Sequence, residues 1–172
     1  MLYVALCNLA GFDPVTCDQP RDENGRWTTD GGSPPVLDWH EPPKPKASGK
    51  GGGGFSASGR TNTEIGDTVE ALVQKMGLKS LLGSKRQNPL DAKLGAYGFE
   101  IKAVTTQSSE YKIKMKSSEI RSKVRYAKEH GFKPATMMVV LGTRKAWVYW
   151  TDGIKNGRLN KDKWKYMGAI SV

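Results

Sequence analysis

The sequence predicts an α/β domain with a mixed sheet flanked by helices, preceded by a flexible N-terminal extension. Two observations predict this fold class. Apolar residues between positions 61 and 150 recur first at helical spacing, then in alternation, then at helical spacing again. The stretch 33–59 is rich in proline and glycine, which is typical of a linker. We therefore expect an N-terminal segment with a short strand and turns at residues 1–32, a linker at residues 33–59 and one domain at residues 60–172.

Residues 61–77 predict the first helix of this domain. Thr61 precedes Glu64 by three residues, which is the spacing of a capping box, and Gly77 is a typical helix end. The apolar residues between them recur at helical spacing: Ile65, Val69, Leu72, Val73 and Met76. Glu70 lies on the shoulder of this stripe, so we expect its side chain to point past the core towards a neighbouring sheet.

Strands are predicted next. Residues 91–94 and 99–104 form two strands joined by the four-residue loop 95–98. Residues 111–115 alternate between apolar and lysine side chains, which predicts a third strand with a basic face. A second helix follows at residues 117–131. The continuous apolar run 137–141 suits a strand covered on both faces, and residues 146–150 and 167–172 predict further strands.

The predicted hairpin brings acidic and basic side chains together. With a four-residue loop, Lys93 faces Glu100 and Asp91 faces Lys102, so all four share one face. Opposed Cβ atoms lie about 5 Å apart and diagonal ones about 7 to 8 Å, which lets both carboxylates reach one cation. A divalent cation such as Mg²⁺ keeps two close carboxylates ionised. The alternative is two cross-strand ion pairs, Asp91–Lys102 and Lys93–Glu100, each stabilising by ~0.2 to 1 kcal/mol.

A lysine beside such an ion can orient an attacking water and offset charge on a phosphate, so these groups suffice for phosphodiester hydrolysis. Leu90-Asp91 followed by Glu100-Ile101-Lys102, after a helix that carries Glu70, resembles the PD-(D/E)XK nuclease superfamily. The expected order of elements is similar to its restriction-endonuclease-like αβββαβ core. One departure is that the family's proline position holds Leu90, with a proline one residue earlier.

The resemblance implies a role for each matching residue. Asp91 and Glu100 would be metal ligands, with the Ile101 carbonyl as a third ligand. Lys102 would position the nucleophilic water, and Glu70 would be an auxiliary ligand or base. The implied cofactor is Mg²⁺, with Mn²⁺ as a substitute. Many nucleases of this kind act as dimers, so the resemblance adds a homodimer to the expected partners.

The charge of the chain indicates a polyanionic partner. Residues 1–59 carry 5 basic and 7 acidic side chains and residues 60–172 carry 22 and 10. The positive charge, +10 for the whole chain, therefore comes from the predicted domain. We expect phosphate contacts from basic residues near the predicted site and before the hairpin: Lys79, Lys85, Arg86, Lys112, Lys114, Lys116, Arg121 and Arg125. The alternative role of those on the third strand is to keep an edge strand from pairing elsewhere.

The amino-acid composition argues against a membrane protein, a disulfide scaffold and a zinc protein. No run of about 18 apolar residues is present, so we expect no membrane span. Cys7 and Cys17 are too few for a disulfide scaffold, and with only His40 and His130 beside them they do not provide a four-ligand zinc site of the usual type. We expect a reducing compartment, namely the cytoplasm.

The leading hypothesis is therefore a metal-dependent endonuclease that hydrolyses DNA. Two alternatives remain: a non-catalytic DNA-binding module that retains a nuclease fold, and a phage structural or assembly protein. Residues 20–28 are similar to segments of phage head and capsid-associated proteins. A phage origin would place the chain in the host cytoplasm or the virion, and the N-terminal segment would contact a phage or other protein partner.

Overall fold

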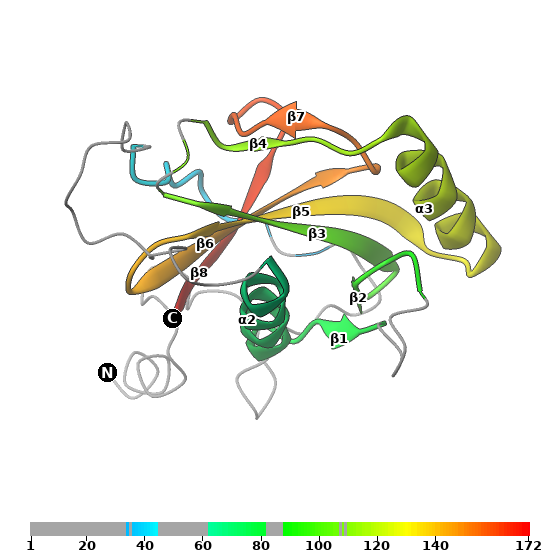
Figure 1. Ribbon diagram of the computed structural model, residues 1–172, viewed down its shortest axis with the longest axis horizontal. Coiled ribbons are helices and arrows are strands. Elements are labelled where there is room, and N and C mark those ends of the chain that lie inside the picture. The colour runs from blue at the N-terminus through cyan, green and yellow to red at the C-terminus, as the bar shows by residue number, and fades with distance from the viewer. Residues whose placement is uncertain (1–33, 35, 45–61, 82–87, 107, 109) are drawn as a thin grey trace.

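A six-stranded mixed sheet with the strand order β1-β2-β3-β5-β6-β8 organises the structure (Figure 1). The computed structural model describes residues 34, 36–44, 62–81, 88–106, 108 and 110–172. Their elements are α2 (Asn62–Lys75), β1 (Lys79–Ser80), β2 (Ala92–Leu94), β3 (Tyr97–Thr105), β4 (Lys112–Ile113), α3 (Ser117–Glu129), β5 (Lys133–Leu141), β6 (Lys145–Asp152), β7 (Gly157–Arg158) and β8 (Lys165–Ser171). The predicted α/β class, with a mixed sheet and two helices in the described residues, is confirmed.

The strand β5 lies in the interior of the sheet because its sequence is apolar on both faces. It pairs in parallel with β3 and antiparallel with β6, and every residue from Ala135 to Leu141 is buried. The chain reaches β5 from β3 by way of α3, as a parallel pair requires a crossover connection. The predicted strand at residues 137–141 is therefore confirmed, and it is longer than the apolar run.

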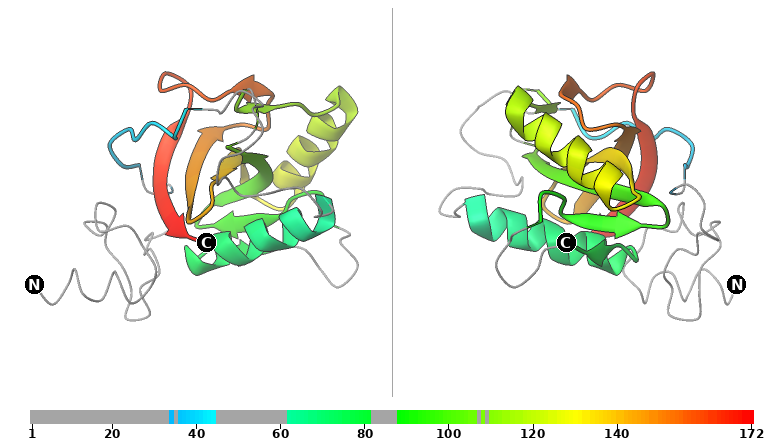
Figure 2. Two further views of the ribbon diagram at one scale, coloured as in Figure 1. Left: turned by 60° about the vertical axis from the view of Figure 1, so that its left-hand side comes forward. Right: turned by 90° about the vertical axis from the view of Figure 1, so that its right-hand side faces the viewer.

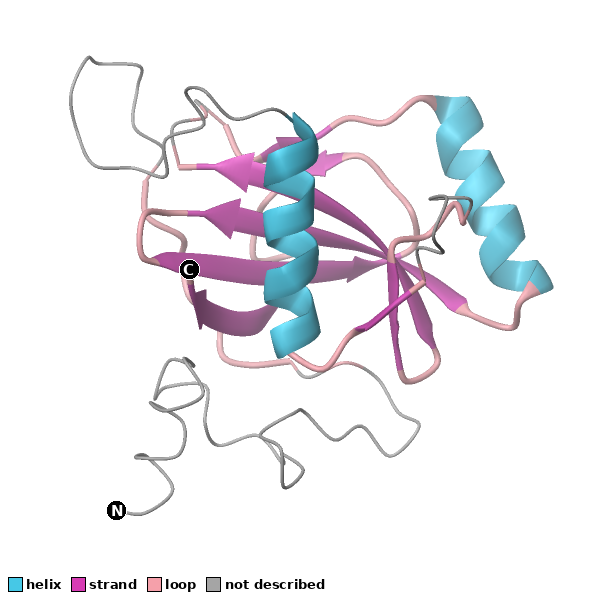
Figure 3. Ribbon diagram, turned by 60° about the horizontal axis from the view of Figure 1, so that its bottom comes forward, coloured by secondary structure: helices cyan, strands magenta, loops and turns pink. Residues whose placement is uncertain are grey.

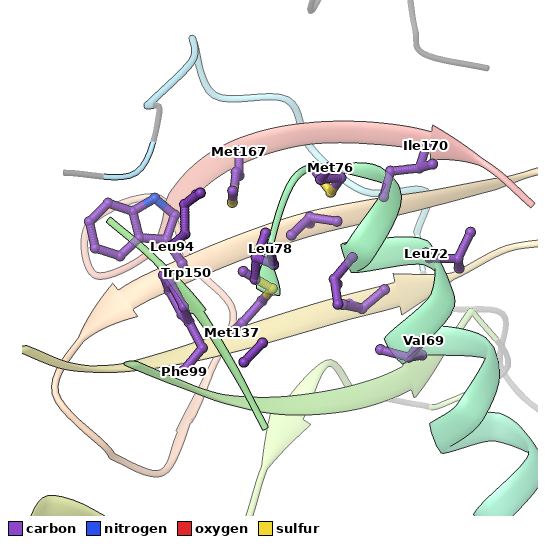
Figure 4. Packing of buried hydrophobic residues seen from close by; sticks show 14 of the residues in the cluster. Val69, Leu72, Met76, Leu78, Leu94, Phe99, Met137, Trp150, Met167 and Ile170 are labelled. Carbon is purple, nitrogen blue, oxygen red and sulfur yellow. The ribbon is translucent and has the colours of Figure 1, made fainter. Parts of the chain in front are cut away.

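Each face of the sheet has its own hydrophobic core. On one face, α2 packs its apolar stripe against the sheet, with Val69, Leu72 and Met76 near Phe99, Met137 and Trp150 (Figures 3 and 4). On the other face, Ala127 of α3 joins Met138, Val140 and Tyr149. Figure 2 shows α2 and α3 from two further directions. Neither described helix has the length and apolar character that a membrane crossing requires.

The hairpin between β2 and β3 is tighter than predicted. Leu94 pairs with Tyr97, so the turn contains only Gly95 and Ala96, and the predicted four-residue loop is wrong. Gly95 has φ +55°, a conformation that favours glycine and permits a two-residue turn. Because the register differs, the alternative arrangement with the ion pairs Asp91–Lys102 and Lys93–Glu100 does not form. Lys93 pairs with Gly98 across the strands instead.

The third predicted strand has the expected alternation but a different partner. Tyr111, Ile113 and Met115 are buried, and the lysines between them are exposed. Only Lys112–Ile113 is strand, and it pairs with β7 in a separate two-stranded sheet. Alternation identifies the buried face of a strand but not the strand that it pairs with. The strand that lies beside the β2–β3 hairpin in the main sheet is instead β1, which pairs with β2 at the sheet edge and which the alternation did not predict.

Part of the predicted linker contacts the domain. The backbone amide of Leu37 donates a hydrogen bond to the carbonyl oxygen of Tyr166 at 2.9 Å. The Tyr149 hydroxyl donates to the carbonyl oxygen of His40 at 2.7 Å. Residues 36–44 therefore lie against the sheet, whereas residues 45–59 and the predicted segment 1–32 fall outside the described residues.

Candidate active site

The candidate site lies along the edge of β3 beyond the point where β2 ends. Ala92, the residue of β2 farthest from the hairpin turn, pairs with Phe99 of β3. From Glu100 to Thr105, β3 therefore pairs only with β5 among the described strands. A cleft of about 240 Å³ opens at this edge, between α2 and α3. Its lining includes every predicted catalytic and metal-binding residue, namely Glu70, Asp91, Glu100, Ile101 and Lys102. The other lining residues are Gly66, Val69, Ala103 and Lys123.

Asp91 continues the hairpin for one residue and then turns its carboxylate into the open edge. Its amide donates a hydrogen bond to the carbonyl oxygen of Phe99 at 2.9 Å. Its Oδ2 accepts one from the Ile101 amide at 2.7 Å. Since the amide and the carbonyl of one strand residue point to the same side, the Ile101 carbonyl faces the same edge. The corrected register thus places Asp91 next to Glu100 rather than Lys102.

Glu100 is a buried carboxylate with a cation at each oxygen. Its exposed fraction is 1%. Lys102 Nζ lies 2.7 Å from Oε1, and Lys123 Nζ lies 2.5 Å from Oε2. The contact with Lys123 is ionic and lacks hydrogen-bond geometry, so the buried Oε2 accepts no hydrogen bond from the described residues. This leaves acceptor capacity on an oxygen inside the cleft.

The electrostatics of the cleft favour a proton on Asp91. Burial, and after it the negative charge of Glu100, raise the pKa of Asp91 from 3.8 to about 7 overall. The hydrogen bond from Ile101 and the charges of Lys123 and Lys102 offset only part of this rise. The negative charge of Glu100 therefore opposes the ionisation of Asp91, and a divalent cation between them would relieve this repulsion.

Lys102 lies where β3 faces α3. Its Nζ lies 2.7 Å from Glu100 Oε1 and 3.6 Å from Glu119 Oε1, and its side chain is 37% exposed. Burial lowers the pKa of Lys102, but the hydrogen bond to Glu100 and the nearby carboxylates outweigh burial, so its pKa is raised overall. The ammonium is held by acidic groups while it remains accessible from solvent.

Lys123 is a member of the site that the sequence reasoning missed. It comes from α3, and its Nζ donates a hydrogen bond to the Pro89 carbonyl at 2.6 Å besides contacting Glu100. A signal for it exists in the sequence. Ile120, Val124 and Ala127 form the apolar stripe of α3, and Lys123 interrupts that stripe at helical spacing. A lysine on the buried side of a helix is rare unless it is paired.

Glu70 reaches the cleft from α2, as its position on the helix predicted. It is half-buried there with Gly66 and Val69 beside it. Glu70, Asp91 and Glu100 do not form a ready metal centre, because the described residues contain no group of three or more His, Cys, Asp or Glu side chains arranged to hold a metal ion. The donors that converge more closely are the carboxylates of Asp91 and Glu100 and the carbonyl of Ile101.

These three donors fit a magnesium-type ion by their chemistry. All are oxygen atoms, which Mg²⁺ prefers, and few protein ligands suffice because Mg²⁺ usually retains several waters. The unfilled acceptor capacity of Glu100 Oε2 is consistent with this.

The predicted phosphate contacts lie on several exposed surfaces. Lys112, Lys114 and Lys116 project from the segment that leads into α3, and Arg121 and Arg125 lie on the exposed side of that helix. Lys79 is exposed on β1. Lys85 and Arg86 lie outside the described residues.

Comparison with known proteins finds no family model, no curated protein and no solved structure that matches this chain.

Proposed function

We propose that this chain is a Mg²⁺-dependent endonuclease that hydrolyses phosphodiester bonds of DNA. The observation that carries the proposal is the meeting of Asp91, Glu100 and Lys102 in one cleft at an open strand edge. Glu100 opposes the ionisation of the neighbouring Asp91, and Lys102 beside them is accessible to solvent. Such a group of residues is suited to binding a cation and activating water.

The order of elements supports the same proposal. The described elements run α2, β1, β2, β3, β4, α3 and β5, of which β4 lies outside the main sheet, and β3 and β5 are parallel. Without β4, this order is similar to the αβββαβ core of restriction-endonuclease-like proteins. Its three strands are β1, β2 and β3, whereas the sequence predicted the two hairpin strands followed by the basic strand. In this interpretation Asp91 lies directly before the second strand, β2, and Glu100, Ile101 and Lys102 lie on the third, β3.

Asp91, Glu100 and the Ile101 carbonyl would hold Mg²⁺, and Mn²⁺ would substitute for it. When bound, the ion supplies a Lewis acid for a phosphate oxygen and lowers the pKa of a water. Lys102 would hold the attacking water and offset negative charge on the phosphate. Glu70, at the α2 side of the cleft, would accept a proton or orient this water.

The substrate class follows from charge. The exposed lysines Lys112, Lys114 and Lys116 precede the helix that supplies Lys123 to the cleft, and they would contact backbone phosphates of the substrate. Binding should weaken with salt, by about 0.9 in the log-log slope for each neutralised phosphate of duplex DNA. A binding constant that does not change with salt would contradict this interface.

The test is a cleavage assay with the full chain on linear, supercoiled, branched and single-stranded DNA and on RNA, in Mg²⁺, Mn²⁺ or EDTA. Asp91→Asn, Glu100→Gln and Lys102→Met should each lower the cleavage rate by about 100-fold or more, the usual effect of removing one electrostatic contributor. Asp162→Asn is the matched control, because this exposed carboxylate lines no part of the cleft. Cleavage in EDTA, or full activity of Glu100→Gln, would refute the proposal.

A second candidate is a DNA-binding module without catalysis. It is favoured by one observation: two lysines already neutralise Glu100 without a metal ion. Equal DNA binding in Mg²⁺ and in EDTA, with no cleavage of any substrate, would support this candidate over the nuclease.

A further inference from the structure

We propose that Lys123 is a positioning residue that stays on Glu100 when a divalent cation binds, whereas Lys102 is the cation that leaves. The inference rests on the proposed metal-dependent function and assigns different roles to the two lysines of the cleft. Both contact Glu100 at similar distances, 2.5 Å for Lys123 and 2.7 Å for Lys102. What separates them is what else holds each ammonium group.

Lys123 is fixed from two directions. Its side chain is 11% exposed and projects from α3. Besides its contact with Glu100, it donates a hydrogen bond to the Pro89 carbonyl at 2.6 Å. Pro89 lies two residues before Asp91, so one ammonium group links the segments that carry the two carboxylates. Withdrawing Lys123 from Glu100 and Pro89 would leave a buried cation and a partly buried carbonyl without these partners, which is costly.

Lys102 is held more loosely. Its side chain is 37% exposed, about three times as much as that of Lys123. Both ammonium groups also lie near Glu119 Oε1, at 3.6 Å for Lys102 and 3.7 Å for Lys123, so the two lysines differ in exposure and in the hydrogen bond from Lys123 to Pro89. A divalent cation at Glu100 would repel both ammonium groups. The group that moves is the one that regains water at least cost. A Lys102 side chain released from Glu100 would then be free to meet the water or the phosphate, which is the role proposed for it.

The two lysines should therefore affect metal affinity in opposite directions. Lys123 holds the carboxylate of Glu100 in place, so its loss should weaken binding. Removing a partner that orients a metal ligand usually costs about 10- to 100-fold in affinity. Lys102 competes with the cation for the same carboxylate, so its loss should leave the affinity unchanged or increase it.

The experiment is a titration of the full-length protein with Mn²⁺ alone, in which electron paramagnetic resonance measures free Mn²⁺. Lys123→Met should bind Mn²⁺ about 10- to 100-fold more weakly than wild type. Lys123→Arg, which keeps the cation, should restore most of that loss. Lys102→Met should bind at least as tightly as wild type. In cleavage assays, excess Mn²⁺ should restore Lys123→Met but not Lys102→Met.

The outcomes separate this inference from the proposed function. Wild-type protein that binds no Mn²⁺, or Glu100→Gln that binds it as wild type does, would overturn the metal site and with it the role of Lys123. A metal site lost in Glu100→Gln but unchanged or strengthened in Lys123→Met would overturn only the role of Lys123. Urea unfolding in EDTA verifies that each variant folds. If Lys123→Met does not fold, weaker Mn²⁺ binding by Lys102→Met would still refute the assignment.

Discussion

The raised pKa of Asp91 predicts how the stability of the protein without metal ions depends on pH. Its carboxyl has a pKa of about 7 in the folded chain against an ordinary value of 3.8, mainly because it is buried and because Glu100 is close. Between these two pH values the folded state binds more protons than the unfolded state. The free energy of unfolding should therefore fall as pH rises, and the stabilisation present below about pH 4 should be lost by about pH 7.

The magnitude follows from the difference between the two pKa values. Each pH unit within this window corresponds to about 1.4 kcal/mol per group, so the full difference of about three units corresponds to roughly 4 kcal/mol. Magnesium ions favour the ionised carboxylates, so saturating Mg²⁺ should flatten the profile if the ion binds there.

The assay is urea unfolding in EDTA at several pH values between 4 and 8. Asp91→Asn should lose this component of the slope, whereas Asp162→Asn should keep the wild-type profile. The informative quantity is the difference between wild type and Asp91→Asn, because other titrating groups cancel in it. A difference that stays constant with pH, or grows in favour of wild type as pH rises, would refute the reasoning about Asp91.

Two further predictions concern the scaffold around the site. Gly98→Ala should lower the free energy of unfolding by about 1 to 3 kcal/mol, because the added Cβ would lie 2.8 Å from Leu90 Cδ1 in a full core. Gly157→Ala, where a Cβ meets no atom within 4 Å, is the matched control in urea unfolding, and equal losses in both variants would contradict the packing argument. Tyr149→Phe should cost about 1 kcal/mol by removing the hydrogen bond to the His40 carbonyl. Limited proteolysis should then cleave residues 36–44 faster than in wild type, and an unchanged rate would show that this bond does not hold the segment.

Residues 117–131 and 137–141 illustrate what periodicity predicts well. The helical spacing there became α3, and the unbroken apolar run became the interior strand β5. Both patterns report how many sides of an element are buried, which depends on the local order of residues. The same reasoning placed Glu70 on a helix shoulder, and the structure finds it in the cleft.

The hairpin shows where such reasoning fails. The two strands were expected, but their pairing depended on the turn, and the positive φ of Gly95 allowed a shorter turn than the one assumed. A change of register moves every cross-strand partner. Asp91 and Glu100 still line one cleft. Asp91 directly precedes the first residue of β2, and its carboxylate accepts a hydrogen bond from the Ile101 amide, which pairs with no described strand on that side.

By itself, the sequence determined the α/β class, the two helices and the set of acidic and basic residues from which a phosphodiester-cleaving site could be built. Only the tertiary structure decided which of these residues meet. The main sheet contains β1 instead of the predicted basic strand, and the hairpin register places Asp91 beside Glu100. Lys123, more than twenty residues further along the chain, contacts the buried Glu100 carboxylate. The physical reason is that periodicity reports which side of an element is buried, whereas pairing and charge compensation depend on partners that are distant in the chain.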